Sequence, residues 1–125
     1  FRGGPSSQRI ENRLGGADAN PYLALAATLG AGLLGIEEKI NPNKPIKGGA
    51  YDIRVPREQQ VPSNLGESAE LFFKSKAARS LFGDVFVDHF ADTRLWEYNE
   101  YKKERKFLEN DKISTWELSR YFEII

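Results

Sequence analysis

The sequence predicts an α+β fold that is mostly helical, with one short strand near its beginning. Residues 8–14 follow a Gly- and Ser-rich stretch, and their alternating charges fit a strand with one charged face. Residues 20–36 start with Asn-Pro and continue without a charge, as in a buried helix. Residues 63–125 contain two capping patterns and apolar residues at helical spacing.

The first helix is expected over residues 20–40. Asn20 is a favourable N-cap, because its side-chain oxygen can accept from free amides of the first turn, and Pro21 suits the first helical position. Residues 22–36 are apolar on every side, which is typical of a helix buried all round. Crossing a bilayer takes about 20 apolar residues, so this stretch is too short to span one.

A connector and a helical tail follow. Residues 41–62 are rich in Pro and Gly and are long for a loop, so we expect them to pack along a surface or serve a function. The tail, residues 63–125, is expected to contain three helices. They begin near Ser63, with Glu67 completing a capping box, at about Val85 and at Ser114, where Glu117 completes a second box.

Composition narrows the classes of function. The 125 residues can bury one ordinary core, so a single domain or a piece of a larger one is expected. Lys and Arg number 18, as do Asp and Glu, which gives no reason to expect binding to nucleic acid or to a membrane surface. The absence of Cys excludes disulfides and is compatible with the cytoplasm. Phe1 stands where an initiator Met would be, which favours a piece of a longer protein.

The strongest candidate for chemistry is the pattern Arg9-x-Glu11-x-Arg13. On a strand these three side chains share one face. The carboxylate offers a hard oxygen ligand to Mg²⁺ or Mn²⁺, and the guanidinium groups offer paired donors to phosphoryl or carboxylate oxygens. Taken alone, the pattern is more often an exposed ladder of opposite charges that contributes little to stability.

Further motifs accompany this pattern in a fixed order. They are RIENR at 9–13, GADANPYL at 16–23, AA at 26–27, GLLGIE at 32–37, GDVF at 83–86 and WE at 116–117. In their order and spacing they resemble the C-terminal part of the glutamine synthetase catalytic domain, and the resemblance covers almost the whole chain. It implies that residues 1–16 form an active-site loop and a strand of a larger antiparallel sheet.

The resemblance also implies roles for four residues. Glu11 matches the carboxylate that binds the metal bridging the nucleotide phosphates, and Arg9 matches an arginine that contacts the transferring phosphate. Arg13 matches an arginine that contacts the glutamate side chain as it becomes an acyl phosphate. Arg2 corresponds to a further phosphate-binding arginine, at a shorter spacing from Arg9 than in the family pattern.

The implied activity is an ATP- and Mg²⁺-dependent (or Mn²⁺-dependent) ligase of nitrogen metabolism that joins glutamate to an amine through γ-glutamyl phosphate. The amine is ammonia or a polyamine, and the GADA sequence, Asn12 and the WE pair favour the γ-glutamyl-polyamine branch. The family further implies a ring-shaped homo-oligomer. No second carboxylate cluster or nucleotide-binding segment is found in the sequence, so these 125 residues are expected to be inactive alone.

Two other interpretations remain open. The protein could be a relative of the glutamine synthetases that has lost activity and serves in structure or assembly. An unrelated helical interaction domain would require the motifs to match by coincidence. The presence of Arg9, Glu11 and Arg13 together favours the enzyme.

Three further features have simpler interpretations. Tyr51 lies near a position where some bacterial members carry an adenylylated tyrosine, but the residues after it differ, and it is expected to pack the connector. His89 lacks metal-ligand spacing and is expected on a helix surface. The basic run at 102–106 is interleaved with acids, including Glu97 and Glu100, and is expected to form ion pairs on a solvated helix face.

Overall fold

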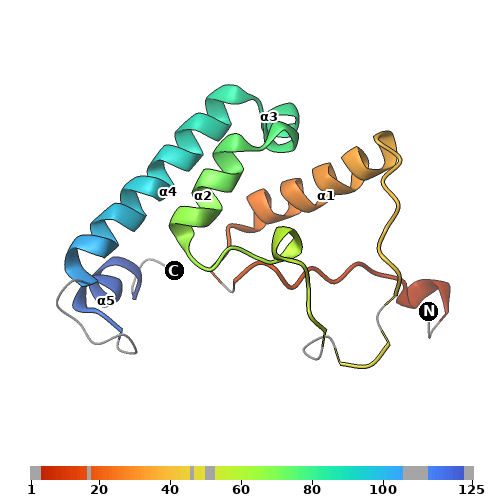
Figure 1. Ribbon diagram of the computed structural model, residues 1–125, viewed down its shortest axis with the longest axis horizontal. Helices are drawn as coiled ribbons and strands as arrows, with labels where there is room; N and C mark the ends of the chain where they lie inside the picture. The colour runs from red at the N-terminus through yellow and green to blue at the C-terminus, as the bar shows by residue number, and fades with distance from the viewer. Residues whose placement is uncertain (1–3, 17, 46, 50–52, 106–112, 123–125) are drawn as a thin grey trace. The chain divides into compact units, whose positions relative to one another are not determined.

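The computed structural model describes residues 4–16, 18–45, 47–49, 53–105 and 113–122 (Figure 1). The chain divides into two compact units, Phe1–Asn41 and Pro42–Ile125. Within the described ranges the regular structure is helical throughout, so the helical part of the predicted fold class is confirmed. None of the helices described there is long and apolar enough to cross a membrane.

The predicted strand is not formed. Residues 8–13 have no regular secondary structure. A strand is stabilised by hydrogen bonds to a neighbouring strand, and the part of the chain that is described offers no second strand to pair with. The strand predicted at 8–14, as part of a larger sheet, is therefore not seen in the described residues.

The first unit consists of the 3-10 helix η1 (Pro5–Ser7), an extended segment and helix α1 (Pro21–Glu37). The predicted start of α1 is confirmed: Asn20 Oδ1 accepts from the amides of Tyr22 at 3.0 Å and Leu23 at 3.2 Å. Most of its apolar side chains are exposed, Leu25 by 70% for example, while Leu23 and Leu34 are partly covered. Burial of α1 on all sides therefore stays a prediction.

The second unit is built on two antiparallel helices. Helices α2 (Leu65–Lys74) and α4 (Asp84–Arg105) lie side by side, joined by α3 (Lys76–Phe82), and α5 (Thr115–Tyr121) lies at the far end of α4 (Figure 1). The 3-10 helix η3 (Arg57–Gln59) precedes α2 within the connector.

The buried apolar core of the described residues in this unit is small: Ala69, Ala78, Val87 and Ala91. Four phenylalanine rings extend it, with neighbouring centroids 5.5–6.3 Å apart: Phe72, Phe82, Phe86 and Phe90.

The local signals at the helix starts are confirmed, with one shift in position. Ser114 Oγ accepts from the Glu117 amide at 3.0 Å, and the Glu117 carboxylate accepts from the Ser114 amide at 2.7 Å. At α2 the N-cap is Asn64, whose Oδ1 accepts from the Glu67 amide at 2.9 Å. Glu67 Oε2 accepts from both the amide and the hydroxyl of Ser63, and these hydrogen bonds lower the pKa of its carboxyl group.

The separate helix α3 was missed by sequence reasoning. Ser75 is extended (φ −74°, ψ 114°) and ends α2, while its hydroxyl caps α3 by accepting from Ala78 at 3.1 Å. Arg79 of α3 then donates to the Phe73 carbonyl and to the carboxylates of Asp84 and Asp88, each at 2.8 Å through a guanidinium nitrogen. These carboxylates raise the pKa of Arg79 further. One guanidinium group thus joins the ends of α2 and α3 to the start of α4.

Close packing of α2 against α4 gives a first testable prediction. Gly66 is buried, and a Cβ atom there would collide with Cδ1 and Cε1 of the Tyr98 ring. We expect Gly66→Ala to lower the free energy of unfolding by about 1–3 kcal/mol through overpacking, despite the better helix propensity of Ala. Urea unfolding followed by circular dichroism measures this change. In a Tyr98→Leu background, which removes the ring, the same substitution should cost less, and an equal cost would contradict the packing argument.

Candidate functional site

Two of the predicted site residues meet in the extended segment before α1. Arg13 contacts Glu11 Oε1 through both Nε and Nη2, each at 2.6 Å. The side chains are open to solvent, with Arg13 exposed by 81% and Glu11 by 56%. Residues two apart in an extended chain point to the same side, so the contact arises without a strand ladder.

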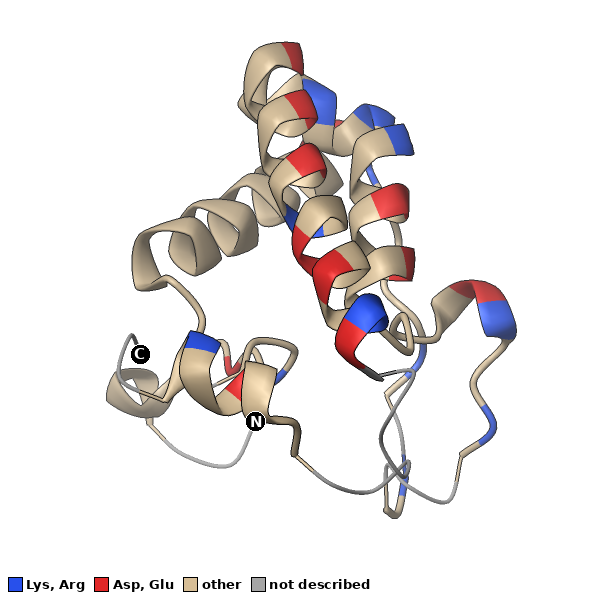
Figure 2. Cartoon of the chain, turned by 90° about the vertical axis from the view of Figure 1, so that its left-hand side faces the viewer, with Lys and Arg blue, Asp and Glu red and all other residues tan. Residues whose placement is uncertain are grey.

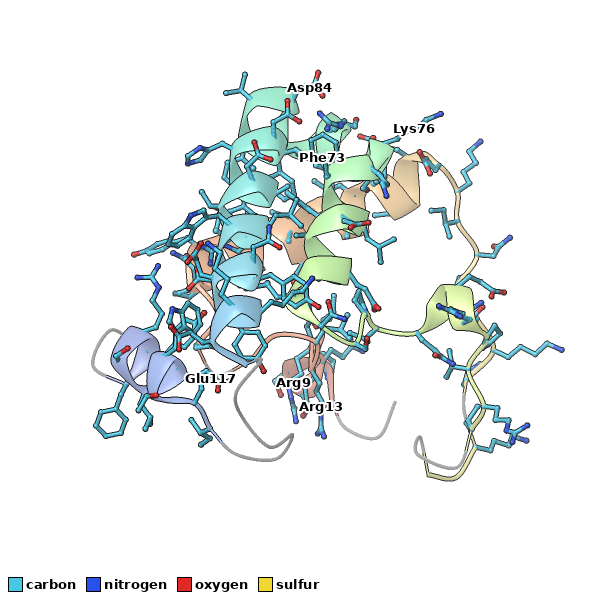
Figure 3. The ribbon with its side chains drawn as sticks, turned by 60° about the vertical axis from the view of Figure 1, so that its left-hand side comes forward. Arg9, Arg13, Phe73, Lys76, Asp84 and Glu117 are labelled. Carbon is cyan, nitrogen blue, oxygen red and sulfur yellow. The ribbon has the colours of Figure 1, made fainter. Side chains whose placement is uncertain are left out.

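Arg9 lies in the same segment but makes a different contact. Its Nη1 donates to the Ser7 carbonyl oxygen at 3.4 Å. Figure 3 shows the side chains of Arg9 and Arg13 projecting from the segment in the same direction. The segment therefore offers guanidinium groups and the Glu11 carboxylate to one region of solvent. Arg2, the fourth predicted residue, lies outside the described residues.

Asn12, which sits between Glu11 and Arg13, connects this segment to α1. Its Nδ2 donates to Thr28 Oγ1 at 3.0 Å, and its Oδ1 accepts from the Leu14 amide at 3.0 Å. Sequence reasoning missed Thr28. A signal was present, because Thr28 is the one hydroxyl residue between residues 23 and 36, in an otherwise apolar helix.

The residues present fit one ligand of a divalent-cation site. Mg²⁺ prefers six oxygen ligands, usually one or two carboxylates together with water and substrate phosphates. Glu11 supplies a carboxylate, and both contacts from Arg13 go to Oε1. Among the described residues no group of three or more His, Cys, Asp or Glu could hold a metal ion. Any site that includes Glu11 must therefore draw its other ligands from outside these residues.

The other features singled out in the sequence lie away from this segment in the chain. His89 is exposed on α4, which confirms the expected surface position, and Tyr51 falls outside the described residues. Figure 2 shows charges of both signs along α2 and α4, whereas α1 is almost free of them. In the basic run, Lys103 pairs with Glu100 at 2.5 Å as expected.

Glu97 was expected on a solvated face, and that prediction is wrong. Its side chain is only 4% exposed, and its Oε1 accepts from Tyr121 Oη at 2.7 Å and from Arg120 Nε at 3.0 Å. Arg94 Nη2 lies 3.4 Å from Oε2. Burial alone would raise the pKa of Glu97, but these donors outweigh it, and the pKa of the carboxyl group is lowered. The same burial and hydrogen bond raise the pKa of Tyr121 to about 12.

Comparison with known proteins agrees with the motifs. Residues 2–121 match the family described as glutamine synthetase, catalytic domain. A glutamate–isopropylamine ligase of a Pseudomonas species is 41% identical over 120 residues, which is 96% of this chain and 24% of that protein. Type-1 glutamine synthetase 2 of Dictyostelium discoideum is 42% identical over 124 residues, 98% of this chain and 22% of that protein. A gamma-glutamylethanolamide synthetase of Streptomyces coelicolor is 38% identical over 117 residues, 94% and 23% respectively.

The chain spans about a quarter of the length of these curated relatives. No solved structure matches it. The family match covers nearly every residue, including the segment that carries Arg9, Glu11 and Arg13. The chain therefore belongs to the glutamine synthetase family and corresponds to part of its catalytic domain.

Proposed function

We propose that the protein containing this chain is an ATP-dependent ligase that joins the γ-carboxylate of glutamate to an amine. The observation that carries the proposal is the contact between Glu11 and Arg13, with Arg9 in the same segment, inside a chain that matches the family over residues 2–121. A relative that had lost its activity would be free to lose one or more of these groups.

The proposed reaction has two steps. A γ-carboxylate oxygen of glutamate attacks the terminal phosphorus of ATP, the bond from that phosphorus to the ADP oxygen breaks, and γ-glutamyl phosphate forms. The amine nitrogen then attacks the acyl carbon, the bond from that carbon to the phosphate oxygen breaks, and the nitrogen loses a proton. Inorganic phosphate and the γ-glutamyl amide are the products.

The residues of this chain bind and neutralise the negatively charged phosphate and carboxylate oxygens of the reactants. Arg9 donates to oxygens of the transferring phosphoryl group, with Arg2 as a further donor, and Arg13 donates to the carboxylate of glutamate as it becomes an acyl phosphate. Glu11 is one ligand of a Mg²⁺ or Mn²⁺ ion, which when bound neutralises the phosphate oxygens. Paired guanidinium and carboxylate groups suit phosphoryl transfer, which depends mainly on positioning and charge neutralisation.

The names of the relatives leave two kinds of amine, since most are glutamine synthetases and two act on other amines. Two of the relatives are named for isopropylamine and for γ-glutamylethanolamide, and the GADA sequence, Asn12 and the WE pair favour a polyamine acceptor. The proposed partners are glutamate, ATP and the amine, and the proposed setting is a ring-shaped homo-oligomer in the cytoplasm.

The proposal is tested on the full-length protein. Phosphate release from ATP is measured with glutamate and Mg²⁺ in the presence of ammonia, ethanolamine, isopropylamine or putrescine, and the products are identified by mass spectrometry. We expect phosphate release that requires both glutamate and an amine, together with the mass of one γ-glutamyl amide. Absence of an amide with every amine would favour a structural or assembly role instead.

The 125 residues alone serve as the control in this assay. They carry one carboxylate ligand of the proposed metal site, so they are expected to release no phosphate above background. Turnover of ATP by this chain alone would contradict an active site shared with other residues.

A further inference from the structure

The segment that carries Glu11 and Arg13 is joined to α1 by a hydrogen bond between two side chains. Its side-chain link to α1 runs through Asn12. We propose that Asn12 and Thr28 are positioning residues that set which way Glu11 and Arg13 face, an inference that rests on the proposed function.

The hydrogen bonds between the two elements form a directed chain. The Leu14 amide donates to Asn12 Oδ1 at 3.0 Å, Asn12 Nδ2 donates to Thr28 Oγ1 at 3.0 Å, and the Thr28 hydroxyl donates to the Ala24 carbonyl at 2.8 Å. Each donor and acceptor is used in the sense its chemistry permits. The amide of Asn12 is therefore held at both ends, by its own segment and by a residue of α1.

Asn12 lies between Glu11 and Arg13, so its hydrogen bond to Thr28 constrains the directions of both neighbouring side chains. Successive side chains of an extended chain point to opposite sides. Asn12 contacts α1, so the alternation places the Glu11 and Arg13 side chains, which contact each other, on the opposite side of the segment. The link between residues 12 and 28 spans 16 positions, so it closes a loop that contains the turn before α1.

Helix α1 is a suitable support for this purpose. It begins at a capped residue, Asn20, and Thr28 lies two turns further on, partly covered, with its hydroxyl bonded back to the helix. Partners that hydrogen-bond a metal ligand directly change metal affinity or activity by about 10- to 100-fold when they are removed, and Asn12, which acts on Glu11 through the backbone, is expected at the lower end.

The test uses the full-length protein with four substitutions. Asn12→Ala and Thr28→Val remove the link from either side, Thr28→Ser keeps the hydroxyl, and Asn43→Ala is the matched control. Asn43 Nδ2 donates to Gln59 Oε1 at 3.2 Å, also across 16 positions between exposed side chains, but in the connector. Each variant is measured for kcat, for the KM of glutamate, for thermal unfolding and for Mn²⁺ affinity by electron paramagnetic resonance.

We expect Asn12→Ala and Thr28→Val each to weaken Mn²⁺ binding and lower kcat by about 10-fold. The double variant should be no worse than either single one, because both break the same link. Thr28→Ser and Asn43→Ala should behave as wild type. A fall in unfolding temperature without a change in Mn²⁺ affinity would overturn the positioning role, as would failure of Thr28→Ser to retain binding.

The two proposals fail in distinguishable ways. If wild type forms no amide, the proposed function fails, and the Mn²⁺ titration of the variants still decides the positioning role. If wild type forms the amide while Asn12→Ala and Thr28→Val keep normal kcat and Mn²⁺ affinity, the positioning role alone is wrong. Absence of Mn²⁺ binding by wild type would overturn both.

Discussion

Replacing Glu11 with Ala in the full-length protein is expected to lower kcat by about 10²–10³-fold and to leave stability nearly unchanged. A bound divalent cation supplies several kcal/mol of transition-state stabilisation, which corresponds to a rate factor of this size. The side chain is 56% exposed, and its ion pair with Arg13 is a surface pair, which contributes about 0–1 kcal/mol to folding. Phosphate release as a function of Mg²⁺ concentration, together with thermal unfolding, measures both effects.

Glu70→Ala is the matched control for this change. Glu70 is also an exposed carboxylate in a surface ion pair, at 3.2 Å from Lys74, but it lies on α2. Both variants should unfold at nearly the wild-type temperature, and only the Glu11 variant should lose turnover and metal dependence. Normal kcat and normal Mg²⁺ dependence in Glu11→Ala would show that the ligand assignment is wrong.

Glu97→Ala is expected to produce the largest loss of stability, on the order of 3 kcal/mol, because one substitution removes a buried carboxylate and all its hydrogen bonds. Glu97 joins α4 to α5 through Arg120 and Tyr121, and its side chain is only 4% exposed. Urea unfolding of the protein measures the loss, and amide hydrogen exchange in α5 should rise first.

The pH dependence of stability should identify the same contact. The pKa of Glu97 is lowered from 4.5, so its contribution is present above pH 4.5 and is lost as the pH falls through the lowered pKa. The pKa of Tyr121 is raised from 10.0 to about 12, so its contribution is present below pH 10 and is lost between about pH 10 and 12. In Glu97→Ala the loss of stability at low pH and the loss at high pH should both be smaller than in wild type.

Glu100→Ala provides the comparison on the same helix. Its ion pair with Lys103 is a more exposed i,i+3 pair, worth about 0.2–0.5 kcal/mol. If the two glutamate variants lost the same stability, the burial of Glu97 would not be the cause.

The local sequence was sufficient to predict structural features that depend on interactions between near neighbours in the chain. The caps at Asn20 and Ser114 were predicted from neighbouring residues because the hydrogen bonds join residues two or three apart. The break at Ser75 was missed although its cap is local, with Ser75 Oγ accepting from the Ala78 amide, and the guanidinium group of Arg79 that connects the helix ends there reaches residues up to nine positions away.

The sequence by itself determined the family, the starts of α1, α2, α4 and α5 and the presence of Arg9, Glu11 and Arg13 in one segment, because these depend on residue identity and spacing. Only the tertiary structure decided that residues 8–13 have no regular secondary structure here, that Glu97 is buried and that Asn12 contacts Thr28. The physical reason is the same in each case. A strand ladder, the burial of a charge and a contact across 16 positions all depend on which distant residue lies opposite, which no local pattern specifies.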